Sequence, residues 1–261
     1  MSEAKPEEIT VGSGDDARRI AILARAGDEP GLFWLGGFAS NMTGSKAEAL
    51  DAFAAGRGFA MTRFDYSGHG SSGGRFEDGT ISLWLEESLA VFDRTNGPQI
   101  VIGSSMGGWL ALLLAEAHRA RVGAEASRLA GLVLIAPAVD MTRALMWEKM
   151  SKRDRAELTE TGLYRAPSDY SESGYVITRK LIEDGDRHLF GDRLIETGCP
   201  VHILQGIRDT DVPWRHATDL VSRLASDDVV LTLVKDGDHR LSRPEDIERI
   251  DAAVAGIIAG D

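Results

Sequence analysis

Short apolar runs alternate along the chain with longer helical patterns, and this alternation restricts the possible fold more than any other feature of the sequence. Runs such as "IVIG" (100–103) and "LVLIA" (132–136) are apolar at every position, as strands covered on both faces of a sheet are. Strands that alternate with helices imply crossover connections and a parallel sheet. We therefore expect an α/β fold with a mostly parallel, twisted sheet and helices on both faces.

The element pattern covers the whole chain. The expected strands are 19–26, 31–37, 59–66, 99–104, 129–139, 200–206 and 229–234. The expected helices are 47–58, 81–97, 107–120, 215–226 and one after Pro244. The length suits one large domain, 1–261. Residues 140–195 separate two strands by more than an ordinary crossover, so we expect them to form a cap or lid insertion of two or three helices.

Composition excludes several classes of function. The formal charge of −12 argues against nucleic acid as a partner, because a phosphate backbone is met by clustered basic residues. The only cysteine, Cys199, cannot form an intramolecular disulfide or a cysteine-rich metal site, and it fits a reducing compartment.

The amino terminus, "MSEAKPEEITVGSGDD", is acidic and carries no apolar signal segment. No apolar run approaches the roughly 18 residues of a membrane span. We therefore expect a cytoplasmic protein without stable membrane insertion.

The pattern Gly-x-Ser-x-Gly occurs twice, at 70–74 and at 103–107. A nucleophilic serine needs a base and a fixed, exposed position, which a sharp turn between a strand and a helix provides. Only the segment 103–107 follows an expected strand and opens an expected helix. Its central residue, Ser105, is the predicted nucleophile, whereas Ser104 is expected to pack at the strand end and Ser72 to lie in a loop.

The segment "GHGSSG" (68–73) also matches Gly-x-Gly-x-x-Gly, the fingerprint of dinucleotide binding. That fingerprint requires a helix that opens on the last glycine, so that the helix N-terminus meets the pyrophosphate. No helical pattern follows here, and we interpret the segment as a loop.

A histidine is the expected base, and the chain has His69, His118, His188, His202, His216 and His239. His239 follows the expected strand 229–234, and ligands bind parallel sheets at the carboxyl ends of the strands. His239 should therefore lie on the same edge of the sheet as Ser105. His69, in the glycine-rich loop, is the second candidate.

The base needs a carboxylate that holds its tautomer and stabilises its charged form. The strand 200–206 leads into "IRDTDVPW", which offers Asp209 or Asp211 on the same edge. Asp236 and Asp238 are closer to His239 in sequence but share its loop.

The order Ser, Asp, His is that of α/β-hydrolases, and the chain resembles this family through "GSSMGG", "DYSGHGSSGG", "QGIRDTDVPW" and "GDHRLS". The resemblance implies that the acid is Asp209, in a Gly-x-x-Asp-x-x-Val-Pro turn. Within the family, "GSSMGGWL", "DVPW" and "DHR" are most similar to mitochondrial palmitoyl-protein thioesterases that also hydrolyse acyl glucuronides.

The resemblance also implies an oxyanion hole built from the backbone N–H groups of Met106 and Phe38. Gly36 stands where many family members have histidine. A serine hydrolase of this kind needs no metal and no cofactor.

The predicted function is therefore hydrolysis of carboxylic esters or thioesters through an acyl-enzyme on Ser105. The predicted partner is a small-molecule or acylated substrate, which Trp109, Met141, Leu145, Met146 and Trp147 are expected to contact. A peptidase or amidase with the same triad, and a non-catalytic ligand-binding protein, are the alternatives.

Overall fold

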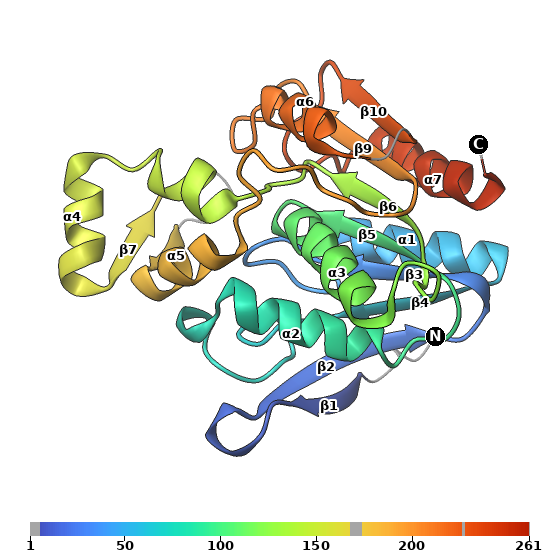
Figure 1. The fold of residues 1–261 in the computed structure, drawn as a ribbon, viewed down its shortest axis with the longest axis horizontal. Coiled ribbons are helices and arrows are strands. Elements are labelled where there is room, and N and C mark those ends of the chain that lie inside the picture. Colours follow the sequence, from blue (N-terminus) through green and yellow to red (C-terminus); the bar gives the residue numbers. More distant parts are fainter. Residues whose placement is uncertain (1–5, 168–173, 226–227, 261) are drawn as a thin grey trace.

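The computed structural model describes residues 6–167, 174–225 and 228–260, in which eight strands form one twisted sheet (Figure 1). In spatial order these strands are β1 (Glu7–Val11), β2 (Arg18–Arg25), β4 (Phe59–Phe64), β3 (Asp28–Leu35), β5 (Gln99–Ser104), β6 (Leu129–Ile135), β9 (Val201–Gly206) and β10 (Val229–Val234). Only β2 pairs antiparallel with its neighbours, β1 and β4. The expected mostly parallel sheet is confirmed.

Helices cover both faces of the sheet, and each face has its own apolar core. One face carries α2 (Ile81–Phe92), α3 (Met106–Val122) and α6 (Trp214–Arg223). The other carries α1 (Ser45–Arg57) and α7 (Pro244–Ala259). Strand β5 shows why both faces need cover, because Val101 enters the first core while Ile100 and Ile102 enter the second.

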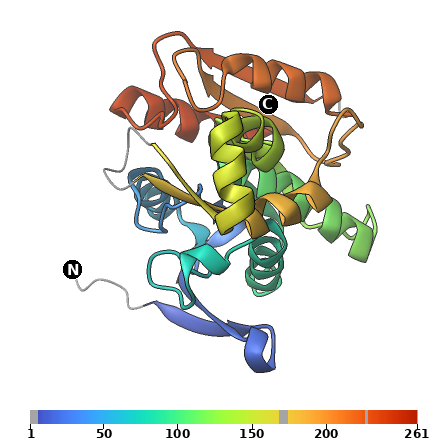
Figure 2. The ribbon, with the colours of Figure 1, turned by 90° about the vertical axis from the view of Figure 1, so that its left-hand side faces the viewer.

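Residues 140–195, called the excursion, lie between β6 and β9 in the sequence, and their described helices and strands between Thr142 and His188 lie beyond the carboxyl ends of the parallel strands (Figures 1 and 2). This excursion contains the π-helical turn η3 (Thr142–Trp147), α4 (Lys152–Thr161), the antiparallel pair β7 (Leu163–Ala166) and β8 (Tyr175–Thr178), and α5 (Arg179–Gly185). Met150, Leu158, Ile177 and Ile182 form a small apolar core of its own.

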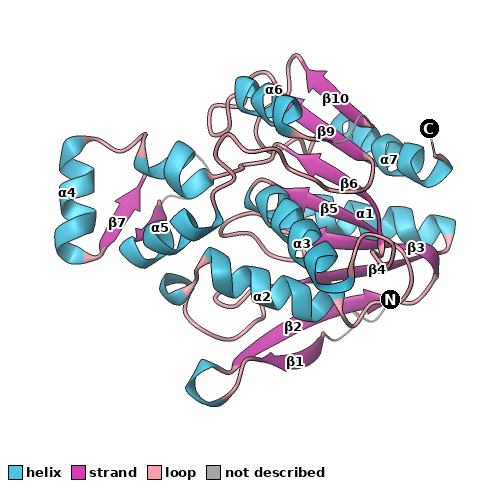
Figure 3. Cartoon of the chain, in the orientation of Figure 1, coloured by secondary structure: helices cyan, strands magenta, loops and turns pink. Residues whose placement is uncertain are grey.

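The excursion contains helices, as expected, and in addition β7 and β8, which form a small second sheet that the sequence does not predict (Figure 3). Strand β1 was also not expected, and α2 ends at Phe92 rather than Gly97. No helix in the described part of the chain is long and apolar enough to span a bilayer.

Candidate active site

Ser105 lies in the sharp turn between β5 and α3, where its backbone adopts φ +55° and ψ −117°. Two glycines allow the strand and helix to approach this closely. A Cβ on Gly103 would lie 2.2 Å from the carbonyl oxygen of Gly107, and a Cβ on Gly107 would lie 2.1 Å from that of Leu35. The turn thus holds Ser105 in a left-handed conformation that other sites in the chain reserve mostly for glycine.

The side chains of Ser105, His239 and Asp209 form a hydrogen-bonded line. Ser105 Oγ lies 3.1 Å from His239 Nε2, and His239 Nδ1 lies 2.8 Å from Asp209 Oδ2. Since an ionised carboxylate only accepts hydrogen bonds, Nδ1 carries the proton and Nε2 is left to accept from the serine. The arrangement can remove a proton from Ser105 when the hydroxyl attacks an electrophile.

Asp209 is buried, and both of its carboxylate oxygens accept hydrogen bonds. Its Oδ1 accepts hydrogen bonds from the backbone N–H groups of Asp211 and Val212, at 2.9 and 2.8 Å, and its Oδ2 accepts from Gln205 Nε2 at 3.0 Å. Asp211, the other carboxylate that the sequence offered in this turn, contributes its backbone N–H to Asp209. Among the described carboxylates, the structure therefore brings Asp209 to the ring of His239.

The other two candidate carboxylates point to partners in their own loop. Asp236 pairs with Arg243, and Asp238 accepts from the backbone N–H groups of Arg240 and Leu241. Asp209, Asp211 and His239 do offer three donor atoms within 4.8 Å of one another, the spacing of a metal site. Both oxygens of Asp209 already accept hydrogen bonds, however, which makes this group an orienting acceptor for the histidine.

The N-terminus of α3 and the turn at 37–40 border the Ser105 side chain. A Cβ on Gly37 would lie 3.4 Å from Ser105 Cβ, and Ser40 closes the turn with its N–H and its hydroxyl on the Gly37 carbonyl. The predicted oxyanion donors, Met106 N–H and Phe38 N–H, belong to these two segments.

His69, the second candidate for the base, supports this turn instead. Its Nε2 accepts a hydrogen bond of 3.2 Å from Ala39 N–H, and its Nδ1 lies 3.1 Å from the carbonyl oxygen of Ser67. Burial among aromatic rings lowers the pKa of His69, which favours the neutral ring that these two bonds require. Both ring nitrogens are thus engaged by backbone groups.

The remaining histidines also have local partners. His118 accepts from the Arg128 N–H, His188 bonds to Ser82, His202 to Thr232, and His216 to the Val139 carbonyl.

Ser105 and His239 line a cavity of about 380 Å³ between the sheet and the excursion. Met141, Leu145 and Met146, three of the predicted substrate contacts, line this acyl-side cavity together with Met150 and Ile177. Its walls are mostly apolar, with Lys149, Asp154 and Asp211 at polar positions.

Two of the predicted substrate contacts, Trp109 and Trp147, do not line the acyl-side cavity. Trp109 is fully buried in the core between α3 and the sheet. Trp147 packs against the small apolar core of the excursion, and the guanidinium of Arg155 lies 5.1 Å from its ring centre. An apolar helix such as α3 gives no periodicity that separates a residue facing a ligand from one facing the core.

A second, polar cavity of about 290 Å³ meets the first at Ser105. The two cavities share four lining residues, Phe38, Ser105, Tyr175 and His239. The ring centres of Phe38 and Tyr175 lie 5.9 Å apart, so these two rings form the wall between the cavities. Tyr175 could not be predicted from the sequence, since the four-residue strand β8 is too short for a periodic pattern.

Comparisons with known proteins agree with this geometry. The family model described as "Serine aminopeptidase, S33" matches residues 35–169. The bovine mitochondrial palmitoyl-protein thioesterase ABHD10 is 36% identical over 242 residues, which cover 92% of this chain and 76% of the relative. The chain belongs to the α/β-hydrolase family. Its resemblance to the thioesterase subgroup, inferred from three short motifs, is confirmed.

Solved α/β-hydrolase structures match the whole fold. A putative hydrolase from Agrobacterium vitis S4 has a TM-score of 0.93 and 51% identity, with 97% of this chain and 98% of that chain covered. The mouse α/β-hydrolase domain-containing protein 10 has a TM-score of 0.87 and 32% identity, with 98% and 99% covered. The chain described here is thus a serine hydrolase of the α/β-hydrolase family.

The relatives correct one expectation. The predicted cytoplasmic location is contradicted by the curated α/β-hydrolase relatives, which are named mitochondrial proteins. That expectation rested on the acidic amino terminus, on the lack of a membrane-length apolar run and on the single cysteine, and none of these features distinguishes the cytoplasm from the interior of an organelle.

Proposed function

We propose that the protein hydrolyses esters or thioesters of apolar acyl chains, with Ser105 as nucleophile, His239 as general base and acid, and Asp209 as the carboxylate that orients His239. The observation that carries the proposal is the hydrogen-bonded line of these three side chains at the junction of an apolar and a polar cavity. The curated relatives, which are named palmitoyl-protein thioesterases, support an acyl substrate.

In the first half of the reaction, Ser105 Oγ attacks the acyl carbonyl carbon while its proton moves to His239 Nε2. The carbonyl oxygen becomes an oxyanion, which the backbone N–H groups of Met106 and Phe38 stabilise. The bond from carbon to the leaving oxygen or sulfur then breaks, and His239 Nε2 gives its proton to the leaving atom. The acyl group remains on Ser105.

In the second half, His239 takes a proton from a water molecule that attacks the acyl-enzyme. Collapse of the second tetrahedral intermediate returns the proton to Ser105 Oγ and releases the carboxylic acid. Throughout, Asp209 Oδ2 accepts the hydrogen bond of His239 Nδ1–H and stabilises the imidazolium form of the ring.

The acyl chain occupies the acyl-side cavity, whose wall is built by Met141, Leu145, Met146 and Met150. Burial of each methylene group there contributes about 0.8 kcal/mol. Thioether side chains adapt to chains of different shape because they are unbranched and polarizable. In this proposal the excursion is the cap that builds the acyl-binding half of the site.

A panel of acyl esters and acyl thioesters of increasing chain length tests the proposal, with Ser105→Ala as the blank. We expect kcat/KM to rise with chain length and then level off when the acyl-side cavity is full. A fluorophosphonate should label Ser105 in the wild type, as located by peptide mass spectrometry. Faster hydrolysis of a matched amide than of the ester, or labelling at a different serine, would contradict the proposal.

A further inference from the structure

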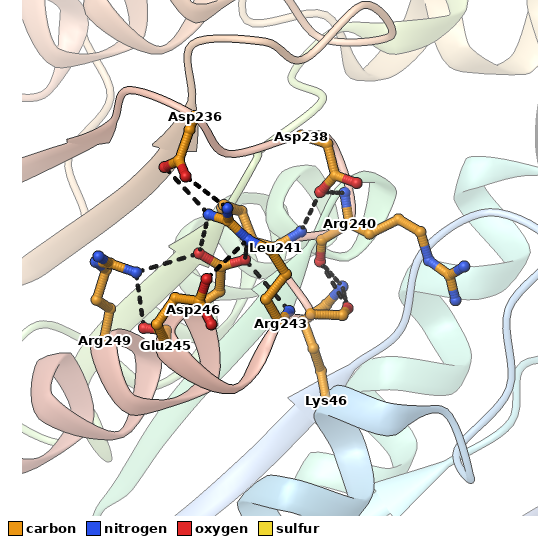
Figure 4. Close-up of polar contacts among 10 residues, drawn as sticks. Lys46, Asp236, Asp238, Arg240, Leu241, Arg243, Glu245, Asp246 and Arg249 are labelled. Carbon is orange, nitrogen blue, oxygen red and sulfur yellow. Dashed lines mark hydrogen bonds and ion pairs between the residues drawn. The ribbon is translucent and has the colours of Figure 1, made fainter.

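The acid turn, residues 209–212, and the loop that carries His239 are built in the same way. Asp209 Oδ1 accepts hydrogen bonds from the backbone N–H groups two and three residues further on, at 2.9 and 2.8 Å. Asp238 Oδ1 accepts from the N–H groups two and three residues after it, at 3.1 and 3.0 Å (Figure 4). An aspartate that bonds its own backbone in this way fixes a turn.

A lysine from a distant part of the chain donates to each of these turns. Lys46 of α1 donates to the Arg240 carbonyl oxygen (Figure 4), and Lys149 of the excursion donates to the Asp211 carbonyl oxygen at 2.8 Å. In both turns the carbonyl belongs to the second residue after the aspartate. The loop of His239 thus takes its lysine from the body of the fold, whereas the acid turn takes its lysine from the excursion.

The backbone around Lys149 is well held, although its side chain is exposed. Arg155 of α4 donates to the carbonyl oxygens of Trp147 and Glu148, at 3.0 and 3.2 Å. The next residue, Met150, is buried in the small apolar core of the excursion. The excursion therefore presents Lys149 from a fixed position to a carbonyl that lies 62 residues away in sequence.

The peptide group that joins Asp211 to Val212 connects the excursion to the carboxylate of Asp209. Its oxygen accepts from Lys149 Nζ, and its N–H donates to Asp209 Oδ1, both at 2.8 Å. Positive charge at the oxygen of a peptide group draws electron density from the nitrogen, so the N–H becomes a stronger donor. The Asp209 side chain is 0% exposed, and a hydrogen bond is electrostatically stronger in such surroundings than in water.

We propose that Lys149 is a positioning residue for the reaction. Through one peptide group it fixes the carboxylate of Asp209, and through Asp209 it fixes the ring of His239. This inference rests on the proposed function, in which Asp209 orients His239. The excursion then has two tasks, since it builds the wall of the acyl-side cavity and also holds the acid turn in the geometry that the reaction requires.

The test compares an acetyl and an octanoyl thioester of the same leaving group in the Lys149→Met variant. Lys149 lines the acyl-side cavity, so a long chain can contact it directly, whereas an acetyl group leaves most of that cavity empty. We expect kcat to fall roughly tenfold for both substrates, as loss of a hydrogen bond to a charged group does, with KM of the acetyl thioester within about twofold of the wild type. Lys149→Arg keeps a cationic donor and should restore most of kcat.

Lys180→Met is the matched control. Lys180 is another exposed lysine of the excursion, and its Nζ donates to the Asp78 carbonyl oxygen at 3.0 Å. The N–H of that peptide group donates to the Phe76 carbonyl rather than to a group of the triad. Lys180→Met should therefore keep the wild-type kcat. Wild-type kcat for the acetyl thioester in Lys149→Met, or an equal loss in Lys180→Met, would overturn the inference.

A double-mutant cycle separates a positioning role from a purely structural one. In an Asp209→Asn background the carboxylate is gone, so Lys149→Met should have little further effect on kcat. A loss by the same factor in both backgrounds would mean that Lys149 acts independently of Asp209 and would also overturn the inference. Wild-type hydrolysis by Ser105→Ala or Asp209→Asn alone would instead contradict the proposed function, so the two failures are distinguishable.

Discussion

The segments 70–74 and 103–107 share the pattern Gly-x-Ser-x-Gly, and the fold uses them in opposite ways. The hydroxyl of Ser72 donates to the Asp65 carbonyl at 2.6 Å and accepts from the Ala21 N–H at 2.9 Å, so backbone groups occupy it. The hydroxyl of Ser105 lies against His239 Nε2 instead. A serine thus becomes a candidate nucleophile when no backbone group engages its hydroxyl and a base lies within hydrogen-bond distance of it.

The glycines of the two segments also serve different purposes. Gly103 and Gly107 are required by close approach, because any Cβ there would collide with backbone oxygens at 2.2 and 2.1 Å. Gly74 has a φ of +89°, and the atom nearest to a Cβ there would be 3.5 Å away. Gly70 combines both restrictions, because it has a φ of +43° and a Cβ there would lie 2.0 Å from Asp65 Oδ2. Close packing against backbone thus restricts both glycines of 103–107, whereas a positive φ restricts both glycines of 70–74.

The largest expected difference between the segments is catalytic. Ser105→Ala should lower turnover by roughly 10⁴- to 10⁶-fold, because no other group can carry the acyl intermediate. Ser72→Ala should stay within a few-fold of the wild type in turnover and lose about 1 kcal/mol of stability for each hydrogen bond. Steady-state kinetics and denaturant unfolding of both variants measure this. An inactive but folded Ser72→Ala would reverse the assignment.

The next effect concerns the acid that orients His239. Asp209→Asn should reduce kcat by roughly 10⁴-fold, since an amide stabilises neither the required tautomer nor the imidazolium. Asp211→Asn should cost far less, because Asp211 contributes its backbone N–H rather than its carboxylate to Asp209. Pre-steady-state acylation rates of the two variants are the measurement. Equal losses in the two variants would mean that the carboxylates of Asp209 and Asp211 orient His239 together.

The third effect is on stability. Gly107→Ala should destabilise the fold by roughly 3 kcal/mol, because a backbone carbonyl cannot move aside as a flexible side chain can. Gly74→Ala should cost only about 1 kcal/mol of backbone strain. Urea unfolding with equal m-values gives the two free energies. Similar costs at both positions would mean that the packing difference is absorbed by relaxation.

The smallest effect tests whether the loop at 68–73 supports catalysis indirectly. His69→Phe keeps a ring in the aromatic cluster but removes the acceptor for the Ala39 N–H. The turn at 37–40, which carries the predicted oxyanion donor Phe38 N–H, should then be less rigid. We therefore expect kcat to fall roughly tenfold with little change in KM. His118→Phe is the control, since His118 also accepts a backbone N–H but lies near α3's far end. Equal kinetics for both variants would remove the role of His69.

Much of the sheet was predictable because the central strands are apolar on both faces. The residues Ile100 to Ile102 of β5 lie between two cores, which the sequence shows directly as an unbroken apolar run. Strand β1 was missed because it is an exposed edge strand of sequence "EEITV", with one buried residue. The pair β7 and β8 was missed because four-residue strands separated by a polar segment carry no periodicity.

The proposed site divides in the same way. Ser105, Asp209 and His239 each follow a strand of the parallel sheet, so topology alone predicts that they meet at one edge. Trp109 was assigned wrongly because α3 is buried on nearly every side, and its sequence does not separate core from cavity. The polar cavity could not be predicted from the sequence, because it forms where α1 approaches the loop of His239. Lys46 and Arg240, which meet there, are 194 residues apart in sequence.

The wall of Phe38 and Tyr175 makes the two halves of a substrate interdependent. Each ring faces both cavities, and one comes from the turn after β3 while the other comes from the excursion. A long acyl chain that fixes the position of this wall also changes the space left for the leaving group. The effect of the acyl chain on kcat/KM should therefore depend on the leaving group. A cycle of four substrates, which combines two acyl chains with two leaving groups, should reveal a coupling energy between the two parts.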